Sequence, residues 1–408
     1  MRINLLTVLL LLFLSSCKDE TKKVADSTSD ATIISLVNPS KIHSSLPRLF
    51  SNSNRLFLSW IEKNDSMARL NYSFYEKDLW SDPKEIIAGS DWFVNWADFP
   101  AIAENHGNIL TSFLQKSANG TYTYDVKLNL FMANSKTWKK NFILHNDGTK
   151  SEHGFVSMRP YVANSFVVTW LDGRETVGKN HGGGQMTLRA AIVFEDGTID
   201  HDTLLDDRVC DCCQTATAIG PNDEIIVAYR DRSEDEIRDI SIVKWQHNGG
   251  WSQPKTIGED NWKIDGCPVN GPSIDSFETG VAVAWFTAEN DNPKVLITFS
   301  DDTGETFGLP FRVDNGLPLG RVDVAMISKK SAVISWIEEK GEETLIQLMK
   351  VNSDGSKNNT VTISKTSSER ASGFPQIEVL GDKIVAAWTD LASETATVRT
   401  ATILINNL

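Results

Sequence analysis

One motif recurs seven times along the chain: a short apolar segment that ends in an aromatic residue and is followed by a polar loop. The aromatic residues are 51 to 59 positions apart and are Trp60, Phe113, Trp170, Tyr229, Trp285, Trp336 and Trp388. An alternating apolar segment follows each aromatic, and shorter segments rich in β-branched residues flank the pair. Four expected strands in roughly 50 residues are typical of a β-propeller blade. No segment keeps the 3.6-residue period of a helical solenoid.

We therefore predict an all-β fold, a single β-propeller of four-stranded antiparallel blades. Seven blades are preferred, and six are the alternative. The last repeat ends after its third strand, and residues 32–37 are a candidate for the missing fourth strand. Pairing of this N-terminal strand with the last blade would close the ring and remove two exposed sheet edges.

The N-terminus carries a separate signal, for export. Arg2 precedes an apolar run over residues 3–14, which is long enough for a secretory signal and too short to span a bilayer. The run ends in Leu-Ser-Ser-Cys17, which resembles the lipobox of bacterial lipoproteins and implies that Cys17 is lipidated. The alternative is an ordinary signal peptide with a chance cysteine.

Three parts of the chain follow from this N-terminal resemblance. We expect a lipoprotein signal peptide over 1–16, the lipidated cysteine and a flexible tether over 17–30, and the propeller over 31–408. Lys18 after the cysteine implies the outer membrane, with the protein on its periplasmic or cell-surface side and in contact with the membrane through the lipid alone. The net charge of −14 argues against nucleic-acid partners. We expect a monomer.

A second resemblance lies in the fifth repeat, in Ser300-Asp-Asp-Thr-Gly-Glu-Thr-Phe307. It resembles the Asp box of bacterial sialidases and related propellers. The motif residues are Ser300, Asp302, Gly304, Thr306 and Phe307. The aspartate accepts turn N–H groups, the glycine takes a positive φ and the aromatic packs inward. The resemblance implies a sialidase-like propeller in which Asp boxes are structural and lie on the face away from the active site.

The opposite face should carry the loops that enter each innermost strand and the loops that follow each aromatic strand. The resemblance to sialidases implies three arginines that bind a carboxylate, an aspartate acid/base and a Tyr–Glu nucleophile on this face. Candidate catalytic residues are Asp98, Asp172, Tyr229 and Glu236, with Tyr124 and Glu152 as further candidates for the Tyr–Glu pair. Candidate substrate-binding residues are Arg48, Arg159, Arg174, Arg230, Arg232 and Arg321.

The segment from Tyr229 to Asp239 is unusually charged, with five carboxylates and three guanidinium groups. Two interpretations stay open. Carboxylates with different environments beside arginines suit acid/base chemistry on an acidic sugar. Alternatively, the loop is a network of internal salt bridges.

Four cysteines remain once Cys17 is assigned to the lipid: Cys210, Cys212, Cys213 and Cys267. In an oxidising compartment we expect one or two disulfides among them. The less favoured alternatives are a thiolate site for a soft metal and free thiols. Cys-x-Cys-Cys departs from the usual Cys-x₂-Cys metal spacing. We therefore expect no cofactor, with a metal ion at these cysteines as the alternative.

Three functions fit these features. The first is a sialidase-like glycoside hydrolase that acts on extracellular glycans. The second is a non-catalytic propeller that binds glycans or proteins, and the third is a metal-binding protein that uses the cysteines. The first Arg of sialidases stands in Arg-Ile-Pro, whereas this chain has Pro47-Arg48-Leu49, and seven repeats exceed the six blades of sialidases.

Overall fold

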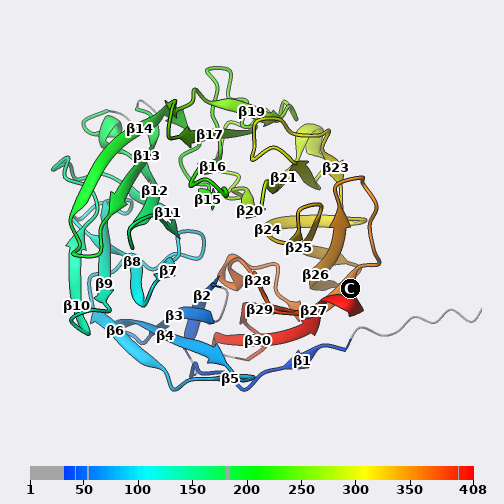
Figure 1. The fold of residues 1–408 in the computed structure, drawn as a ribbon, viewed down its shortest axis with the longest axis horizontal. Coiled ribbons are helices and arrows are strands. Elements are labelled where there is room, and N and C mark those ends of the chain that lie inside the picture. The colour runs from blue at the N-terminus through cyan, green and yellow to red at the C-terminus, as the bar shows by residue number, and fades with distance from the viewer. Residues whose placement is uncertain (1–31, 42, 53–54, 180–183, 394) are drawn as a thin grey trace, which may run out of the picture. The chain divides into compact units, whose positions relative to one another are not determined.

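Seven antiparallel β-sheets are arranged in a ring (Figure 1). The computed structural model describes residues 32–41, 43–52, 55–179, 184–393 and 395–408, and residues 31–408 form one compact unit. The predicted all-β propeller with seven blades is confirmed, and the six-blade alternative is wrong. The signal peptide, Cys17 and the tether lie outside the described residues.

The first four blades follow the sequence repeats in order. Blade 1 contains β2 (Ser44–Ser51), β3 (Leu56–Lys63) and β4 (Ala68–Glu76), with β5 (Leu79–Trp80) and β6 (Lys84–Gly89) both paired to β4. Blade 2 contains β7 (Ile102–Asn105), β8 (Asn108–Lys116), β9 (Tyr124–Met132) and β10 (Thr137–Ile143). Blade 3 contains β11 (His153–Pro160), β12 (Phe166–Asp172), β13 (Met186–Val193) and β14 (Ile199–Val209). Blade 4 contains β15 (Ala216–Ile219), β16 (Ile225–Arg230) and β17 (Ile240–Gln246), with β18 (Gly250–Trp251) and β19 (Lys255–Gly258) both paired to β17.

The remaining blades complete the ring. Blade 5 contains β20 (Ser273–Phe277), β21 (Gly280–Thr287), β22 (Lys294–Ser300) and β23 (Phe311–Arg312). Blade 6 contains β24 (Leu317–Ser328), β25 (Ser331–Lys340), β26 (Glu343–Asn352) and β27 (Val361–Thr366). Blade 7 contains β28 (Gln376–Leu380), β29 (Lys383–Asp390), β30 (Thr397–Leu404) and the N-terminal β1 (Ile34–Ser35). The 3-10 helices of the described chain are η1 (Arg174–Thr176), η2 (Glu289–Asp291), η3 (Arg370–Ser372) and η4 (Ile405–Asn407), and none of them could cross a membrane.

Closure of the ring occurs in blade 7, as predicted. Ile34 of β1 pairs with Thr402 of β30, so the start of the propeller supplies the outer strand of its last blade. The innermost strands β2, β7, β11, β15, β20, β24 and β28 contact one another in this order, and β28 returns to β2. Closure gives the last blade its fourth strand.

The repeated aromatics explain why the blades stack. Each lies in the second strand of its blade, and Trp60, Trp170, Trp285 and Trp336 are fully buried. Each packs against the preceding blade: Trp285, for example, lies among Ile226 and Ile242 of blade 4. Because a buried aromatic of this size removes some 150–250 Å² from water, the repeat supplies one large apolar contact at each blade interface.

The Asp box forms the hairpin between β22 and β23. Asp302 Oδ1 accepts hydrogen bonds from Thr306 N (2.9 Å) and Ser300 Oγ (2.7 Å). Gly304 has a φ of +80°, a conformation that glycine adopts without steric cost. Phe307 packs against the cluster that contains Trp285. In an antiparallel blade this hairpin and the loops that enter the innermost strands lie at opposite strand ends. We call the face that carries these entry loops the mouth, and the Asp box therefore lies on the opposite face.

Candidate functional site

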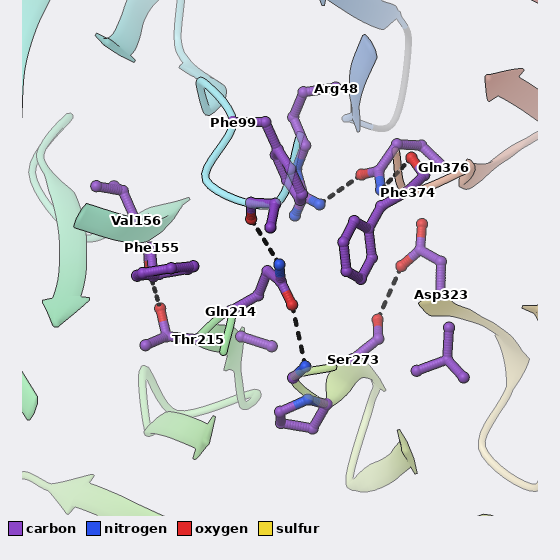
Figure 2. A pocket seen from close by; sticks show the side chains of 15 residues that line it. Arg48, Phe99, Phe155, Val156, Gln214, Thr215, Ser273, Asp323, Phe374 and Gln376 are labelled. Atoms are coloured by element: carbon purple, nitrogen blue, oxygen red, sulfur yellow. Dashed lines mark hydrogen bonds between the residues drawn. The ribbon is translucent and has the colours of Figure 1, made fainter. Parts of the chain in front are cut away.

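Side chains fill the centre of the ring. Two neighbouring cavities there have volumes of about 30 and 20 Å³, which is room for a water molecule or two but not for a sugar. The larger one is lined by Arg48, Phe99, Gln214, Phe374 and Gln376 among others (Figure 2). Neither of these two cavities could therefore hold a glycan.

Two of the predicted substrate-binding arginines lie inside this channel. Arg48 is in β2 and Arg159 in β11, whereas the sequence placed them in loops of the mouth. Arg48 donates to the Gln376 side chain and lies over the Phe99 ring, and Arg159 Nε donates to Thr217 O (2.9 Å). Burial lowers the pKa of Arg48. These arginines bind the protein itself.

Acidic side chains of the channel connect neighbouring blades. Asp323 Oδ2 accepts from Ile377 N (2.8 Å), and Asp275 Oδ2 accepts from Met326 N (2.7 Å). Glu378 accepts from Ser51 Oγ (2.7 Å), and burial raises its pKa to about 7. The sequence analysis did not single out Asp275 or Glu378. Their bonds to adjacent strands indicate a structural role.

Two further predicted arginines, Arg230 and Arg321, are buried and donate to backbone carbonyls. Arg230 donates to the carbonyls of Asn270, Arg238 and Phe286 at 2.5–2.9 Å. Arg321 donates to the carbonyls of Ser368, Glu369 and Gly373 and lies 5.1 Å from the Trp96 ring centroid. Neither guanidinium group is available to a substrate carboxylate in this arrangement.

The charged loop after β16 is internally paired. Glu236 accepts from Arg232 Nη2 and from Arg238 Nη2, both at 2.8 Å. These hydrogen bonds, the one from Arg232 first, lower the pKa of Glu236. Tyr229 is buried, and its hydroxyl donates to Asp206 Oδ2 at 2.6 Å. The sequence did not predict Asp206, and Tyr229 and Glu236 do not form a pair.

Asp172 occupies a position that recurs in the repeat. It follows Trp170 by two residues and accepts from that indole N–H at 2.9 Å. Glu62 and Glu338 stand two residues after Trp60 and Trp336 and accept from those indoles, both at 3.0 Å. An acid at this position therefore satisfies a buried indole N–H, which is a structural task.

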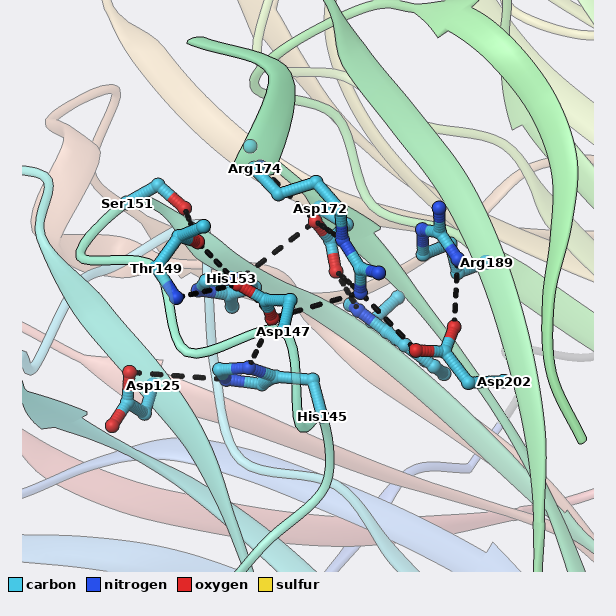
Figure 3. Close-up of polar contacts among 12 residues, drawn as sticks. Asp125, His145, Asp147, Thr149, Ser151, His153, Asp172, Arg174, Arg189 and Asp202 are labelled. Atoms are coloured by element: carbon cyan, nitrogen blue, oxygen red, sulfur yellow. Dashed lines mark hydrogen bonds and ion pairs between the residues drawn. The ribbon is translucent and has the colours of Figure 1, made fainter. Parts of the chain in front are cut away.

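Asp172 also belongs to a polar cluster between blades 2 and 3 (Figure 3). Arg174 forms two hydrogen bonds with it, at 2.8 and 2.7 Å, and reaches Asp202 at 3.2 Å. Burial opposes ionisation of Asp172, but the hydrogen bonds from Arg174 and Trp170 and the interaction with His153 together lower its pKa. Asp172 and Arg174 are thus a closed ion pair.

The same cluster contains two stacked imidazoles that the sequence did not predict as a pair. The rings of His145 and His153 are 3.6 Å apart, and both are buried. Asp147 Oδ2 lies 2.8 Å from His145 Nδ1 and 3.2 Å from His153 Nε2. Asp125, His145 and His153 have ligand atoms close enough for one metal ion, and so have Asp147, His153 and Asp172, but Asp147 already bridges the two imidazoles.

A different arrangement lies at the mouth between blades 2 and 3. The Tyr124 hydroxyl is 3.0 Å from Asp98 Oδ2 and 2.7 Å from Glu152 Oε1. Asp98 precedes β7, Tyr124 begins β9, and Glu152 precedes β11, so three separate segments meet here. Unlike Asp172 and Glu236, neither carboxyl has a cation within ion-pair distance among the residues that the structure describes. We call this group the Asp98–Tyr124–Glu152 triad.

The triad favours a bound proton. A tyrosine hydroxyl has one hydrogen, which it can donate fully to one carboxyl or share more weakly between two. Both contacts are full hydrogen bonds when one carboxyl carries a proton and donates it to the phenol oxygen. The geometry therefore favours one protonated carboxyl, Asp98 or Glu152.

Burial explains how a carboxyl keeps a proton near neutral pH. Burial raises the pKa of Asp98 to about 7, against the hydrogen bonds from Phe155 N and Tyr124. It raises the pKa of Glu152 to about 8, again against the bond from Tyr124. Burial, and then the charges of both acids, raise the pKa of Tyr124 well above its ordinary value. Glu152 alone of the three is partly exposed.

Close packing fixes the triad. Phe93 stacks on Tyr124 with a centroid distance of 4.2 Å, and Phe155 N donates to Asp98 Oδ1 at 2.7 Å. Gly154 lies against the triad so closely that a Cβ atom there would be 1.9 Å from Asp98 Oδ2. The sequence signal for this site was the Tyr–Glu pairing, which did not distinguish Tyr124–Glu152 from Tyr229–Glu236.

Comparisons with known proteins identify the fold. No family model and no curated protein matches the chain. Solved structures match it: the polysaccharide lyase Uly1 has a TM-score of 0.54 at 10% identity and covers 94% of this chain and 96% of that one. An ulvan lyase bound to -[GlcA(1-4)Rha3S]- has a TM-score of 0.52 at 10% identity (91% and 94% covered), and phage phi92 endosialidase has 0.51 at 9% (92% and 69%). The chain has the fold of a sialidase-like β-propeller.

The four cysteines of this sialidase-like propeller gather at the mouth, but they form no disulfide. Cys210, Cys212 and Cys213 lie between β14 and β15, and Cys267 lies between β19 and β20. All four are free, and Cys210 Sγ is 3.5 Å from Cys213 Sγ, far beyond the 2.05 Å of a disulfide. The disulfide that the sequence analysis favoured is therefore not found.

A large apolar groove lies on the opposite face of the sialidase-like propeller. Its volume is about 560 Å³, and its lining includes Tyr161, Phe194, Trp245, His247 and Trp251. It is far larger than the cavities of the channel, and it holds no carboxyl group. The groove suits binding of an apolar or sugar surface, whereas the triad suits proton transfer.

Proposed function

We propose that this protein cleaves a glycosidic bond in extracellular glycans, with Glu152 as the proton donor to the leaving-group oxygen. The observation that carries the proposal is the single Tyr124 hydroxyl shared by two carboxyls, because this arrangement favours a stored proton at the mouth. Solved structures with the same fold include two polysaccharide lyases and an endosialidase, which supports glycans as the substrate class.

The three residues of the triad have different roles in this proposal. Glu152 is partly exposed and can reach a substrate, whereas Asp98 and Tyr124 are buried behind it. When Glu152 gives up its proton, its carboxylate accepts the hydrogen bond of the Tyr124 hydroxyl. Asp98 and Tyr124 are positioning residues that set the protonation of Glu152. This acid serves hydrolysis and elimination alike, since both must protonate a leaving oxygen.

The spacing of the carboxyls does not make Asp98 a nucleophile. The two hydrogen bonds limit the separation of the facing oxygens to 5.7 Å, the sum of 2.7 and 3.0 Å, which is near the spacing of retaining glycosidases. However, Asp98 is buried and holds the Phe155 N–H with its other oxygen. We therefore propose only the acid.

Sialic acid is not part of the proposal. All six arginines predicted to bind a carboxylate donate to side chains or carbonyls of the protein. A substrate carboxylate would have to displace these partners. The support therefore extends to glycans as a class and not to one sugar.

A test compares two carboxyls of the mouth that differ in pairing. Glu152→Gln keeps the size of the side chain but cannot donate an acidic proton, so we expect a loss of 10²–10⁴-fold in kcat on any glycan that the wild type cleaves. Glu236→Gln is the control, and we expect less than about a threefold change in kcat. The measurement is release of reducing or unsaturated ends from a panel of polysaccharides and chromogenic glycosides. Wild-type activity in Glu152→Gln would overturn the proposal.

Binding without cleavage is the second candidate. The aromatic groove on the opposite face, which includes Trp245 and Trp251, supports it. In this case the wild type cleaves none of the panel but binds a glycan by calorimetry, and Trp251→Ala weakens that binding while Glu152→Gln does not.

We further propose that Cys17 tethers the protein to the outer membrane. The support is the lipobox resemblance in the sequence. Cys17→Ser is expected to move the protein from the membrane fraction to the soluble periplasmic fraction. Continued membrane association of this variant would contradict the tether.

A further inference from the structure

We infer that Cys210, Cys212, Cys213 and Cys267 bind one soft metal ion, zinc(II) or copper(I), through their thiolates. The first three come from one loop and the fourth from the next entry loop along the ring. This site shares no residue with the triad, although Cys267 is close enough to Glu152 to contribute to its raised pKa, and it does not depend on the proposed function.

The sulfur positions fit a metal better than a disulfide. Cys210 Sγ lies 3.5 Å from Cys213 Sγ and 4.0 Å from Cys212 Sγ, and the three sulfurs lie within 4.8 Å of one another. In a tetrahedral site with Zn–S bonds of about 2.3 Å, two sulfurs are about 3.8 Å apart. The observed distances lie on either side of this value. They are almost twice the length of a disulfide bond.

Cys267 is the fourth ligand of the proposal, although its sulfur is not among the three that lie within 4.8 Å of one another. It lies in the loop between β19 and β20. It is exposed, so small movements of its loop can bring Sγ into the coordination sphere. Four thiolates form a closed set, which is typical of structural and not catalytic zinc sites.

A buried arginine faces the cluster. Arg238 Nη1 donates to Cys210 Sγ at 3.2 Å, and Glu236 holds the same guanidinium group through Nη2 at 2.8 Å. Four thiolates and one zinc(II) carry a net charge of −2, which a buried cation partly offsets. A hydrogen bond of this kind to a ligand atom orients the ligand toward the metal.

The ion would connect the two entry loops on either side of blade 4. Metal binding replaces thiol protons, which are released to solvent, and the coordination energy then stabilises the folded mouth. We expect the metal-free protein to unfold at lower temperature while its blades, which share none of these ligands, keep their sheet structure.

The first experiment measures metal in the full chain. Protein purified without chelators is analysed for zinc and copper, and we expect about one ion per chain. Metal-free protein is then titrated with cobalt(II), which in a thiolate tetrahedron gives intense visible absorption. Less than about 0.1 ion per chain, together with no cobalt spectrum, would overturn the inference.

Variants test the ligands. Cys267 is exposed, so Cys267→Ser should fold, lose the tetrahedral cobalt spectrum and release its metal to a chelator at least tenfold faster than the wild type. Cys17→Ser is the matched control, because it changes a cysteine that is not one of the four proposed ligands and should change neither property. A Cys267→Ser protein with unchanged spectrum and metal retention would exclude Cys267 as a ligand and overturn the four-thiolate site. None of these experiments measures glycan cleavage, so failure of this site and failure of the proposed function are distinguishable.

Discussion

Two groups of acids at the mouth differ in their partners. In the loop after β16, Glu236 is held by Arg232 and Arg238 at 2.8 Å each. In the triad, Asp98 and Glu152 share only the Tyr124 hydroxyl. The first group stays ionised because cations lower the pKa of Glu236, whereas burial raises the pKa of both acids of the second.

The partners of a carboxyl decide whether it can act as an acid. Many charged residues close together in sequence, as in residues 229–239, predict ion pairs. An ion pair favours the ionised form of the acid, so the acid holds no proton. A general acid at neutral pH needs the reverse, a carboxyl that is desolvated and lacks a cation. Asp98 and Glu152 beside Tyr124 meet this condition, whereas the acids of the charged loop 229–239 do not.

The largest expected effect is on how stability depends on pH. Asp98 has a folded pKa of about 7, raised from 3.8, so ionisation costs folding free energy: stability is full below pH 3.8 and falls as pH rises through 7. Asp98→Asn keeps the bonds to Phe155 and Tyr124 and removes this loss. Relative to wild type, the variant should gain up to about 4 kcal/mol between pH 4 and pH 8, measured by urea unfolding.

The paired acid should show the opposite sign. The folded pKa of Glu236 is lowered, so its contribution to stability is present above its unfolded pKa and is lost as pH falls. Glu236→Gln should therefore destabilise the protein more at pH 7 than at pH 3. For Asp98→Asn, an unfolding free energy that changes with pH in the same way as that of the wild type would mean that the triad holds no extra proton.

The second effect is steric. Gly154→Ala puts a Cβ 1.9 Å from Asp98 Oδ2 and 3.0 Å from a Tyr124 ring atom, so the triad must move apart. We expect a loss of about 1–3 kcal/mol in unfolding free energy, together with loss of activity. Gly249→Ala is the control, since the nearest atom to its Cβ is 3.8 Å away. Equal stability of the two variants would show that the triad is loosely packed.

The fold was predictable because its signal is local and repeated. Each blade places its aromatic in the second strand, and seven copies of one pattern average out irregular positions. The acid two residues after the aromatic, as in Glu62, Asp172 and Glu338, also repeats. Alignment of the repeats on this position would have identified Asp172 as structural from sequence. Likewise, Asp275, Asp323 and Glu378 share the pattern of an aliphatic residue followed by an acid in innermost strands.

The candidate site was only partly predictable because its contacts are distant in sequence. Asp98 binds Tyr124 and Phe155, which are 26 and 57 positions away, whereas Arg232 binds Glu236 four positions on. The spacing of residues along the chain indicates short-range contacts such as Arg232–Glu236, but it does not indicate long-range contacts such as Asp98–Tyr124. The cysteines illustrate the same limit, since clustering was visible in sequence but the separation of the sulfurs was not.

The smallest expected effect separates the two tyrosines of the mouth. Tyr124 and Tyr229 are equally buried, and Phe in either place keeps the ring and removes one hydroxyl. Tyr229→Phe breaks one bond, to Asp206, and should cost about 1 kcal/mol in urea unfolding with activity within twofold of wild type.

Tyr124→Phe removes the group that two carboxyls share, so it should cost about 1–2 kcal/mol and shift the pH optimum as well. Without the hydroxyl, the carboxyls of Asp98 and Glu152 face each other directly. Loss of the first proton from the pair stays unfavourable, and loss of the second proton becomes still less favourable. The pH–rate profile of Tyr124→Phe should therefore move its alkaline limb, and that of Tyr229→Phe should not. If the two variants share one profile, proton storage does not depend on the shared hydroxyl, and the two acid groups of the mouth differ only in their ion pairs.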